Sequence, residues 1–211
     1  MKLGTRFKNE PYLAFKKEDA VLDGNLNSWV IPKDKVTELW KGRNVAVSAI
    51  VAAIVNGEIY FLINERGTGT PDYKDKWNFV CGYLEGHESG NEGCTREVYE
   101  ETGIFIDPER FSLVMVQTNP LMCNNGNVTL RYLCVLPYII DIPDNSSNSS
   151  ERGGENNEVS GVRWIHAGDI SEYDWAFDHE STLKYYRYLI KEKLGNEYID
   201  DIAHVIPIQY N

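Results

Sequence analysis

Two long apolar runs separated by an Asn-Gly pair dominate the middle of the chain. Residues 44–55 read N-V-A-V-S-A-I-V-A-A-I-V, which is typical of a buried strand, and residues 58–65 read E-I-Y-F-L-I-N-E. An Asn-Gly pair between such runs is a strong hairpin signal, because both residues tolerate the positive φ of a tight turn. The pattern therefore predicts two antiparallel strands joined at Asn56-Gly57.

Shorter apolar runs further along indicate more strands and two helices. In the last of these runs, Leu183, Tyr186 and Ile190 follow helical spacing, so we expect their side chains to face a core. A hairpin followed by a helix, further strands and a final helix favours an α/β fold with a mixed sheet between helices. The pattern predicts strands at 77–81, 111–118, 128–135 and 158–165, and helices at 90–102 and 179–194.

The residues before this pattern are interpreted as an extension. Pro32 can open a short helix in which Val36, Leu39 and Trp40 have helical spacing, since proline is tolerated at the first helical position. The expected organisation is an N-terminal extension over 1–43, one domain over 44–195 and a C-terminal tail over 196–211.

The chain is acidic, with 32 Asp and Glu against 21 Lys and Arg among 211 residues and a net charge of −11. Such a balance argues against a general nucleic-acid-binding surface. An acidic protein that acts on an anionic substrate needs metal ions to offset the repulsion. Negative charge that only aids solubility is the alternative for most of the surface.

The apolar runs and the cysteines give no indication of a membrane or of an oxidising compartment. The longest apolar run, 45–55, is too short to cross a bilayer as a helix, and residues 1–10 are polar, unlike a secretory signal. We therefore expect a cytoplasmic protein with reduced thiols. The four cysteines, which form no C-x-x-C pair, are Cys81, Cys94, Cys123 and Cys134.

Three carboxylates share one face of the helix expected at 90–102. Glu97, Glu100 and Glu101 are spaced i, i+3, i+4, so they lie within about one turn of each other. Like charges at this spacing repel, and hard oxygen ligands suit magnesium, calcium or manganese. The helix itself has a clear start, because Ser89 and Glu92 form a capping-box pattern.

A solvated acidic face is the ordinary alternative, and the flanking residues argue against it. Val98 and Ile104 give the helix apolar positions to bury, and Glu88 and Arg96 are an opposite-charge pair that can hold the preceding loop against it. Gly82 permits a close backbone approach just before that loop.

These residues form one pattern, G-x5-E-x7-R-E-U-x-E-E-x-G-U with U aliphatic, and this pattern resembles the signature of the Nudix hydrolases. The residue before its first glycine is Cys81, where this family commonly has a second glycine. The matching positions are Gly82, Glu88, Arg96, Glu97, Val98, Glu100, Glu101, Gly103 and Ile104.

The resemblance implies the Nudix α/β/α sandwich and cleavage of a nucleoside diphosphate linked to another group. It also implies that Mg²⁺ or Mn²⁺ binds Glu97, Glu100, Glu101 and the backbone carbonyl of Gly82. Glu100, Glu101 and Arg96 are then expected catalytic residues, with Arg96 mainly orienting the helix and loop. The general base is a further glutamate in some members, so Glu155 and Glu158 are candidates, at the edge of a polar loop over 144–157. Ordinary surface glutamates are the alternative for these two.

Substrate contacts are expected among basic and aromatic residues. The run Asp174–Glu180, D-W-A-F-D-H-E, is similar to a segment before the last helix of some ADP-ribose pyrophosphatases and of related nucleotide-sensing regulators, which makes His179 a candidate. Solvated basic side chains, and aromatic or histidine side chains packed in a core, are the alternatives. The candidates for phosphate contact are Arg66, Lys74, Lys76 and Arg131, and those for stacking on a base are Tyr73, Trp77 and Tyr83.

Three functions follow from the resemblance. The first is a metal-dependent hydrolase of a nucleoside diphosphate derivative, with ADP-ribose or a sugar nucleotide as the leading substrate. The second is a nucleoside triphosphate pyrophosphohydrolase that cleanses the nucleotide pool, and the third is a sensor that binds a nucleotide without cleaving it. The expected partner is a small nucleotide, with neither nucleic acid nor membrane, and a homodimer is possible by analogy with the family.

Overall fold

The structure, a computed structural model, describes residues 44–119, 127–144 and 157–194, together with the backbone of four short strands before residue 44. Contacts between Cα atoms divide the chain into Met1–Arg43 and Asn44–Asn211. Cys123 and Glu155 lie outside the described residues.

The first unit contains two short antiparallel strand pairs. Strand β1 (Pro11–Ala14) pairs with β4 (Thr37–Trp40), and β2 (Val21–Asp23) pairs with β3 (Ser28–Val30). The helix predicted to run from Pro32 to Trp40 is therefore wrong at Thr37–Trp40. Because a strand partner is available at Pro11–Ala14, pairing overrides the weak helical spacing of these few residues.

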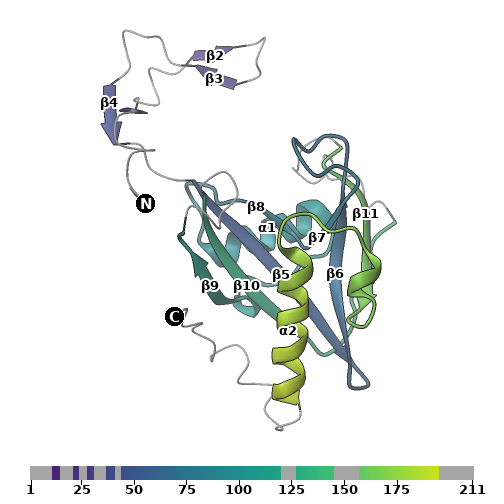
Figure 1. Ribbon diagram of the computed structural model, residues 1–211. Coiled ribbons are helices and arrows are strands. Elements are labelled where there is room, and N and C mark those ends of the chain that lie inside the picture. Colours follow the sequence, from purple (N-terminus) through teal and green to yellow (C-terminus); the bar gives the residue numbers. More distant parts are fainter. Residues whose placement is uncertain are drawn as a thin grey trace, which may run out of the picture. The chain divides into compact units, whose positions relative to one another are not determined.

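The second unit is built on a mixed seven-stranded sheet (Figure 1). Its path is β11-β6-β5-β10-β9, with β7 on β6 and β8 on β5. Strands β5 and β10 are parallel and the other pairs are antiparallel, which confirms the predicted mixed sheet. The strands are β5 (Val45–Val55), β6 (Glu58–Arg66), β7 (Trp77–Asn78), β8 (Cys81–Tyr83), β9 (Ser112–Gln117), β10 (Val128–Leu136) and β11 (Val159–His166).

The predicted hairpin is present, and the predicted strand at 77–81 is divided. Asn56 and Gly57 have φ values of 53° and 80°, as a tight turn between β5 and β6 requires. The chain then passes from one strand of the hairpin to the other, since β7 pairs with β6 whereas β8 pairs with β5. Between them Phe79 and Val80 are both buried, and the Ala49 N–H donates to the Val80 carbonyl at 2.9 Å.

Both predicted helices are confirmed, α1 (Gly90–Thr102) and α2 (His179–Leu194). At the start of α1, the Ser89 hydroxyl accepts from the Glu92 N–H, and the Glu92 carboxylate accepts from the Ser89 N–H at 2.7 Å. Gly103 ends this helix at φ 76°. Two short 3-10 helices, Pro108–Arg110 and Ile170–Glu172, complete the set in the described residues.

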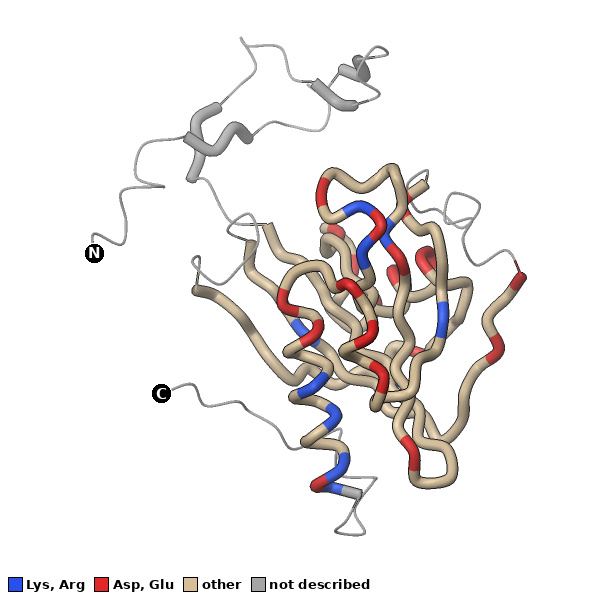
Figure 2. Tube along the Cα trace, turned by 45° about the vertical axis from the view of Figure 1, so that its right-hand side comes forward, with Lys and Arg blue, Asp and Glu red and all other residues tan. Residues whose placement is uncertain are grey.

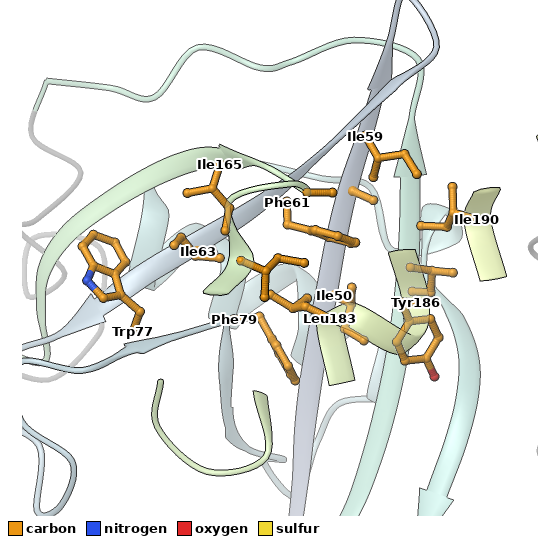
Figure 3. Close-up of a cluster of buried hydrophobic side chains, with 14 of the residues drawn as sticks. Ile50, Ile59, Phe61, Ile63, Trp77, Phe79, Ile165, Leu183, Tyr186 and Ile190 are labelled. Atoms are coloured by element: carbon orange, nitrogen blue, oxygen red, sulfur yellow. The ribbon is translucent and has the colours of Figure 1, made fainter. Parts of the chain in front are cut away.

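The two helices cover opposite faces of the sheet, as the α/β/α sandwich predicts (Figure 1). The α2-side core contains Ile50, Phe61 and Phe79 with the predicted inward residues of α2, which are all buried. Figure 3 shows Leu183 and Tyr186 pointing into this core beside Ile50 and Phe61. The α1-side core contains Val47, Ala49, Val51, Cys94, Val98 and Ile104.

Charged residues at the two ends of α2 are of the sign that the helix dipole favours. Glu180 lies in the first turn, whereas Lys191 and Lys193 lie in the last (Figure 2). Among the described residues, no helix combines the length and the apolar composition that crossing a bilayer requires. The described cysteines, Cys81, Cys94 and Cys134, are free thiols.

Candidate active site

The three predicted carboxylates of α1 differ in how deeply they are buried. Glu97 is 7% exposed and Glu101 is 2% exposed, whereas Glu100 is half-buried. Burial of Glu97 and Glu101 is possible because α1 packs on β5, β8 and β10 through its apolar side. The packing of α1 on the sheet therefore places two of the three carboxylates inside the protein, which a solvated helix face would not do.

Gly82 lies directly against one of these carboxylates. It pairs with Val47 across β8 and β5, and a Cβ atom on Gly82 would overlap the carboxylate of Glu97. Glycine is required here by close approach, because any side chain would occupy the place of the Glu97 oxygens.

Arg96 connects helix α1 to the loop before it, which carries Glu88. Its Nε and Nη2 donate to the two oxygens of Glu88 at 3.0 and 2.7 Å, which confirms the predicted pair. Its Nη1 donates to Glu97 at 2.9 Å and to Glu100 at 3.1 Å. Its Nη2 also donates to the Tyr83 carbonyl at 2.9 Å, so one guanidinium fixes three carboxylates and the end of β8.

Asn64 is a site residue that the sequence interpretation missed. Its Nδ2 donates to Oε2 of Glu101 at 2.7 Å, and the residue is 2% exposed. Its register partner across β6 and β7 is Asn78, and the Oδ1 atoms of both are buried without a hydrogen bond within the described part of the chain. The available signal was a polar residue at the end of the buried apolar run of β6.

Burial and neighbouring negative charges raise the pKa values of the two buried carboxylates. Burial raises the pKa of Glu97 to about 7, with Glu100 and Glu158 adding to the rise and Arg96 opposing it. Burial also raises the pKa of Glu101 well above its usual value, and the charges of Glu97 and Glu158 add to the rise. Arg66 and Asn64 act on the pKa of Glu101 in the opposite direction. A cation at this place would relieve the repulsion.

The donor set suits a hard divalent cation that keeps part of its water. Within the described ranges, no group of three acidic, histidine or cysteine side chains is placed to hold a metal ion. Mg²⁺, however, commonly keeps several waters and binds one or two carboxylates together with substrate phosphates. Glu97 and Glu101 provide such a pair, and Glu100 lies on the same face.

Two of the predicted substrate residues, Arg66 and Trp77, are largely enclosed by neighbouring side chains. The side chain of Arg66 is 11% exposed, its Nη2 donates to Asp72 at 2.6 Å, and its guanidinium lies 5.0 Å from the ring centre of Phe177. Trp77 belongs to the α2-side core, with the guanidinium of Arg163 4.3 Å from its ring centre.

Arg131 and His179 are both buried near the start of α2. Arg131 donates to Thr182 at 3.1 Å and lies over the ring of Phe79, and its contacts with Asp178 are longer, 3.4 and 3.5 Å. His179 stacks on the same ring and accepts from the Phe79 N–H at Nδ1. Burial, with the charges of Arg131 and Arg66, holds the pKa of His179 well below its usual value. Their contact with a substrate stays a prediction.

Replacing Gly82 should disturb the carboxylate pair without unfolding the protein. We expect Gly82→Ala to weaken Mn²⁺ binding by about 10–100-fold, the range seen when support around a metal ligand is lost. The melting temperature should change little, because the overlap is with the end of one side chain. Titration calorimetry with Mn²⁺ measures the effect. Gly86→Ala is the matched control, since nothing lies within 4 Å of its added Cβ, and equal Mn²⁺ affinity in the two variants would contradict the prediction.

Comparisons with known proteins agree with this geometry. The model of the NUDIX domain family matches residues 42–186. The phosphatase NudJ of Escherichia coli K12 is 28% identical over 120 residues, which cover 57% of this chain and 69% of that protein.

Two solved structures share the fold. The NUDIX domain of Shewanella oneidensis NrtR, crystallised with ADP ribose, matches with a TM-score of 0.57 and 18% identity over 71% of this chain and 90% of that one. A bifunctional NMN adenylyltransferase/ADP ribose pyrophosphatase from Francisella tularensis, complexed with AMP and a Mn ion, matches with a TM-score of 0.50 and 24% identity over 74% of this chain and 42% of that one. Since the family model covers most of the chain and the signature residues lie on α1 and directly beside it, the chain belongs to the Nudix hydrolase family.

Proposed function

We propose that this chain uses a divalent cation to hydrolyse the diphosphate bond of a nucleoside diphosphate linked to another group, with ADP-ribose or a sugar nucleotide as the leading substrate. The observation that carries this proposal is the pair of buried carboxylates, Glu97 and Glu101, held by Arg96 and Asn64. Burying two like charges side by side costs free energy unless a cation compensates them.

Each site residue has a distinct role in this proposal. Glu97 and Glu101 would hold Mg²⁺ or Mn²⁺, with Glu100 and the carbonyl of Gly82 completing the ligand set. When bound, the ion supplies positive charge against the phosphate oxygens and acidifies a water molecule. Arg96 orients Glu97 and Glu100 through its hydrogen bonds, so these two carboxylates keep their places while substrate enters and leaves.

A further glutamate near the start of β11 is proposed as the general base. Among the described residues, the charge of Glu158 raises the pKa of both Glu97 and Glu101, which supports Glu158 as a candidate. Glu155 precedes it by three residues and lies outside the described residues. Both are proposed as bases beside Glu100, and glutamine variants of the three, compared in turnover, identify the one that acts.

Two observations support ADP-ribose as the leading substrate. The D-W-A-F-D-H-E segment leads into the first turn of α2, and its phenylalanine and histidine lie beside Arg66 and Phe79 respectively. The Shewanella domain of the same fold was crystallised with ADP ribose, and the Francisella enzyme is named an ADP ribose pyrophosphatase.

A screen of diphosphate compounds tests this function. The purified chain should release AMP from ADP-ribose, or a nucleoside monophosphate from a sugar nucleotide, in the presence of Mg²⁺ or Mn²⁺. Activity should vanish with a chelator and return when the ion is restored, because two carboxylates alone only add negative charge at the phosphates. Liberated phosphate after phosphatase coupling is the readout.

The same screen separates the other functions. Pyrophosphate released from nucleoside triphosphates, with no AMP from ADP-ribose, would replace the proposal by a pool-cleansing pyrophosphohydrolase. Calorimetric binding of ADP-ribose without cleavage under any metal condition would replace it by a sensor.

A further inference from the structure

Near the start of α2, a row of neighbouring aromatic rings extends from the core to the surface. The rings of Tyr73 and Phe177 lie 4.6 Å apart between centroids, and Phe177 lies 5.2 Å from the ring of His179. His179 in turn stacks on Phe79 at 3.6 Å. These four rings form a column, here named the aromatic column, which runs from Phe79 in the core to Tyr73, 43% exposed, at the surface.

The two outer residues of the column have unfavourable backbone conformations. Tyr73 has φ 48° and Phe177 has φ 56°. Bulky L-residues rarely adopt this region, where glycine or asparagine costs less. Two large rings kept at such positions, and touching each other, indicate a role for the rings that folding alone does not supply, since strained residues tend to cluster at functional sites.

Arg66 links this column to the carboxylate pair. Its guanidinium lies 5.0 Å from the ring centre of Phe177 and is held by the carbonyl and the carboxylate of Asp72, at 3.1 and 2.6 Å. Asn64, which binds Glu101, is two residues earlier on β6 and therefore points to the same side of the strand. The charge of Arg66 accordingly lowers the pKa of Glu101 and that of His179. A cation thus stands between the acidic site and the aromatic column.

We propose that the outer end of the aromatic column, Tyr73 with Phe177, is the stacking site for the planar base of the nucleotide substrate, and that Arg66 receives a phosphate of the same molecule. This inference rests on the proposed function and deepens it. A base on the column and phosphates toward Glu97 and Glu101 would place Arg66 beside the linking phosphate. The buried inner rings hold the outer ones in place, so the stacking surface is organised before the substrate arrives.

A small planar ligand fits this surface better than a protein partner does. An aromatic side chain presents about 150–250 Å² in total, and part of that area is already used within the column. A stable protein interface needs roughly 800 Å² per partner. Two rings therefore provide the area for a base and not for a folded partner.

Tyr73→Asn separates a stacking role from a structural one. Asparagine tolerates positive φ, so the melting temperature of this variant should stay unchanged or rise. The affinity for AMP should fall between about fivefold and a hundredfold, the range for loss of one base–aromatic stack. Affinity for ribose 5-phosphate, which has the sugar and phosphate without the base, should not change. Titration calorimetry with the two ligands measures both effects.

Three further variants complete the test. Tyr73→Phe keeps the ring and should keep wild-type AMP affinity. Phe177→Leu removes a ring at similar apolar volume and should lose AMP affinity as Tyr73→Asn does. Tyr188→Ala removes a tyrosine that is 59% exposed on α2 and should change neither affinity. In the hydrolysis assay, Tyr73→Asn should raise KM by the same factor and leave kcat within about twofold, since the stack binds substrate and transition state alike.

The outcomes distinguish this inference from the proposed function. If the wild-type protein binds AMP no better than ribose 5-phosphate, or if Tyr73→Asn binds AMP as tightly as Tyr188→Ala does, the stacking site is wrong even when diphosphates are hydrolysed. If AMP affinity depends on Tyr73 while no diphosphate is cleaved, the stacking site stands and the proposed hydrolysis is wrong.

Discussion

Glu101→Gln should remove nearly all diphosphate hydrolysis while the protein stays folded. A bound divalent ion contributes several kcal/mol of charge stabilisation to the transition state, so losing a carboxylate that holds it should lower kcat by on the order of 10²–10³-fold. A glutamine side chain at this position has nearly the same shape, and its carbonyl can accept the hydrogen bond that Asn64 now donates to Glu101. Removing a charge that repels Glu97 should also leave the free energy of unfolding unchanged or higher without metal.

Turnover, Mn²⁺ affinity and thermal unfolding are measured on the same preparation of this variant. Glu109→Gln is the control, because Glu109 is exposed and lies outside the carboxylate face of α1. Wild-type turnover in a folded Glu101→Gln protein would end the assignment of Glu101 as a metal ligand.

Arg96→Met should cause the largest loss of stability among single substitutions at the site. Arg96 is 22% exposed at its side chain and pairs with Glu88, Glu97 and Glu100, whose side chains are 7%, 9% and 16% exposed. Removing one partner of a buried ion pair leaves uncompensated charge and costs about 3–5 kcal/mol. Partial exposure screens the charges, so we expect about 3 kcal/mol of lost unfolding free energy in a chelator.

The loss from Arg96→Met should shrink when Mg²⁺ is present, because the ion supplies positive charge to the same carboxylates. Urea unfolding with chelator and with Mg²⁺ measures the difference. Lys184→Met is the control, since Lys184 pairs with Glu180 at two exposed side chains, and such a pair contributes about 0.3–0.5 kcal/mol. A cost for Arg96→Met as small as that of the control would show that Arg96 does not compensate the carboxylates.

The elements that the sequence predicted well are those whose hydrogen bonds are local. The capping box of Ser89 and Glu92 spans three residues, and the Asn56-Gly57 turn closes between adjacent residues, so both follow from short stretches of chain. The strand predicted at 77–81 was less accurate, because its division depends on pairing with two different strands. The helix predicted through Thr37–Trp40 was wrong for the same reason, since this segment is a strand whose partner lies at Pro11–Ala14.

The candidate site divides in a similar way. The spacing of Glu97, Glu100 and Glu101 was sufficient to place them on one helix face, and Gly82 and Arg96 were identified from the same signature. Which carboxylates are buried was not determined by spacing, since burial depends on how α1 packs on the sheet.

The sequence by itself determined that this chain has a hairpin followed by a capped helix with an acidic face. The hydrophobic periodicity, the helix caps and the charge spacing are all properties of residues that are near each other in the chain. Only the tertiary structure decided that Asn64 binds Glu101, and that Tyr73 meets Phe177. The first pair is 37 residues apart in the sequence. The second is brought together because the backbone of Trp77 in β7 bonds to Asp174 and Ala176, just before α2. Contacts of that kind depend on the packing of the whole sheet, which no local pattern records.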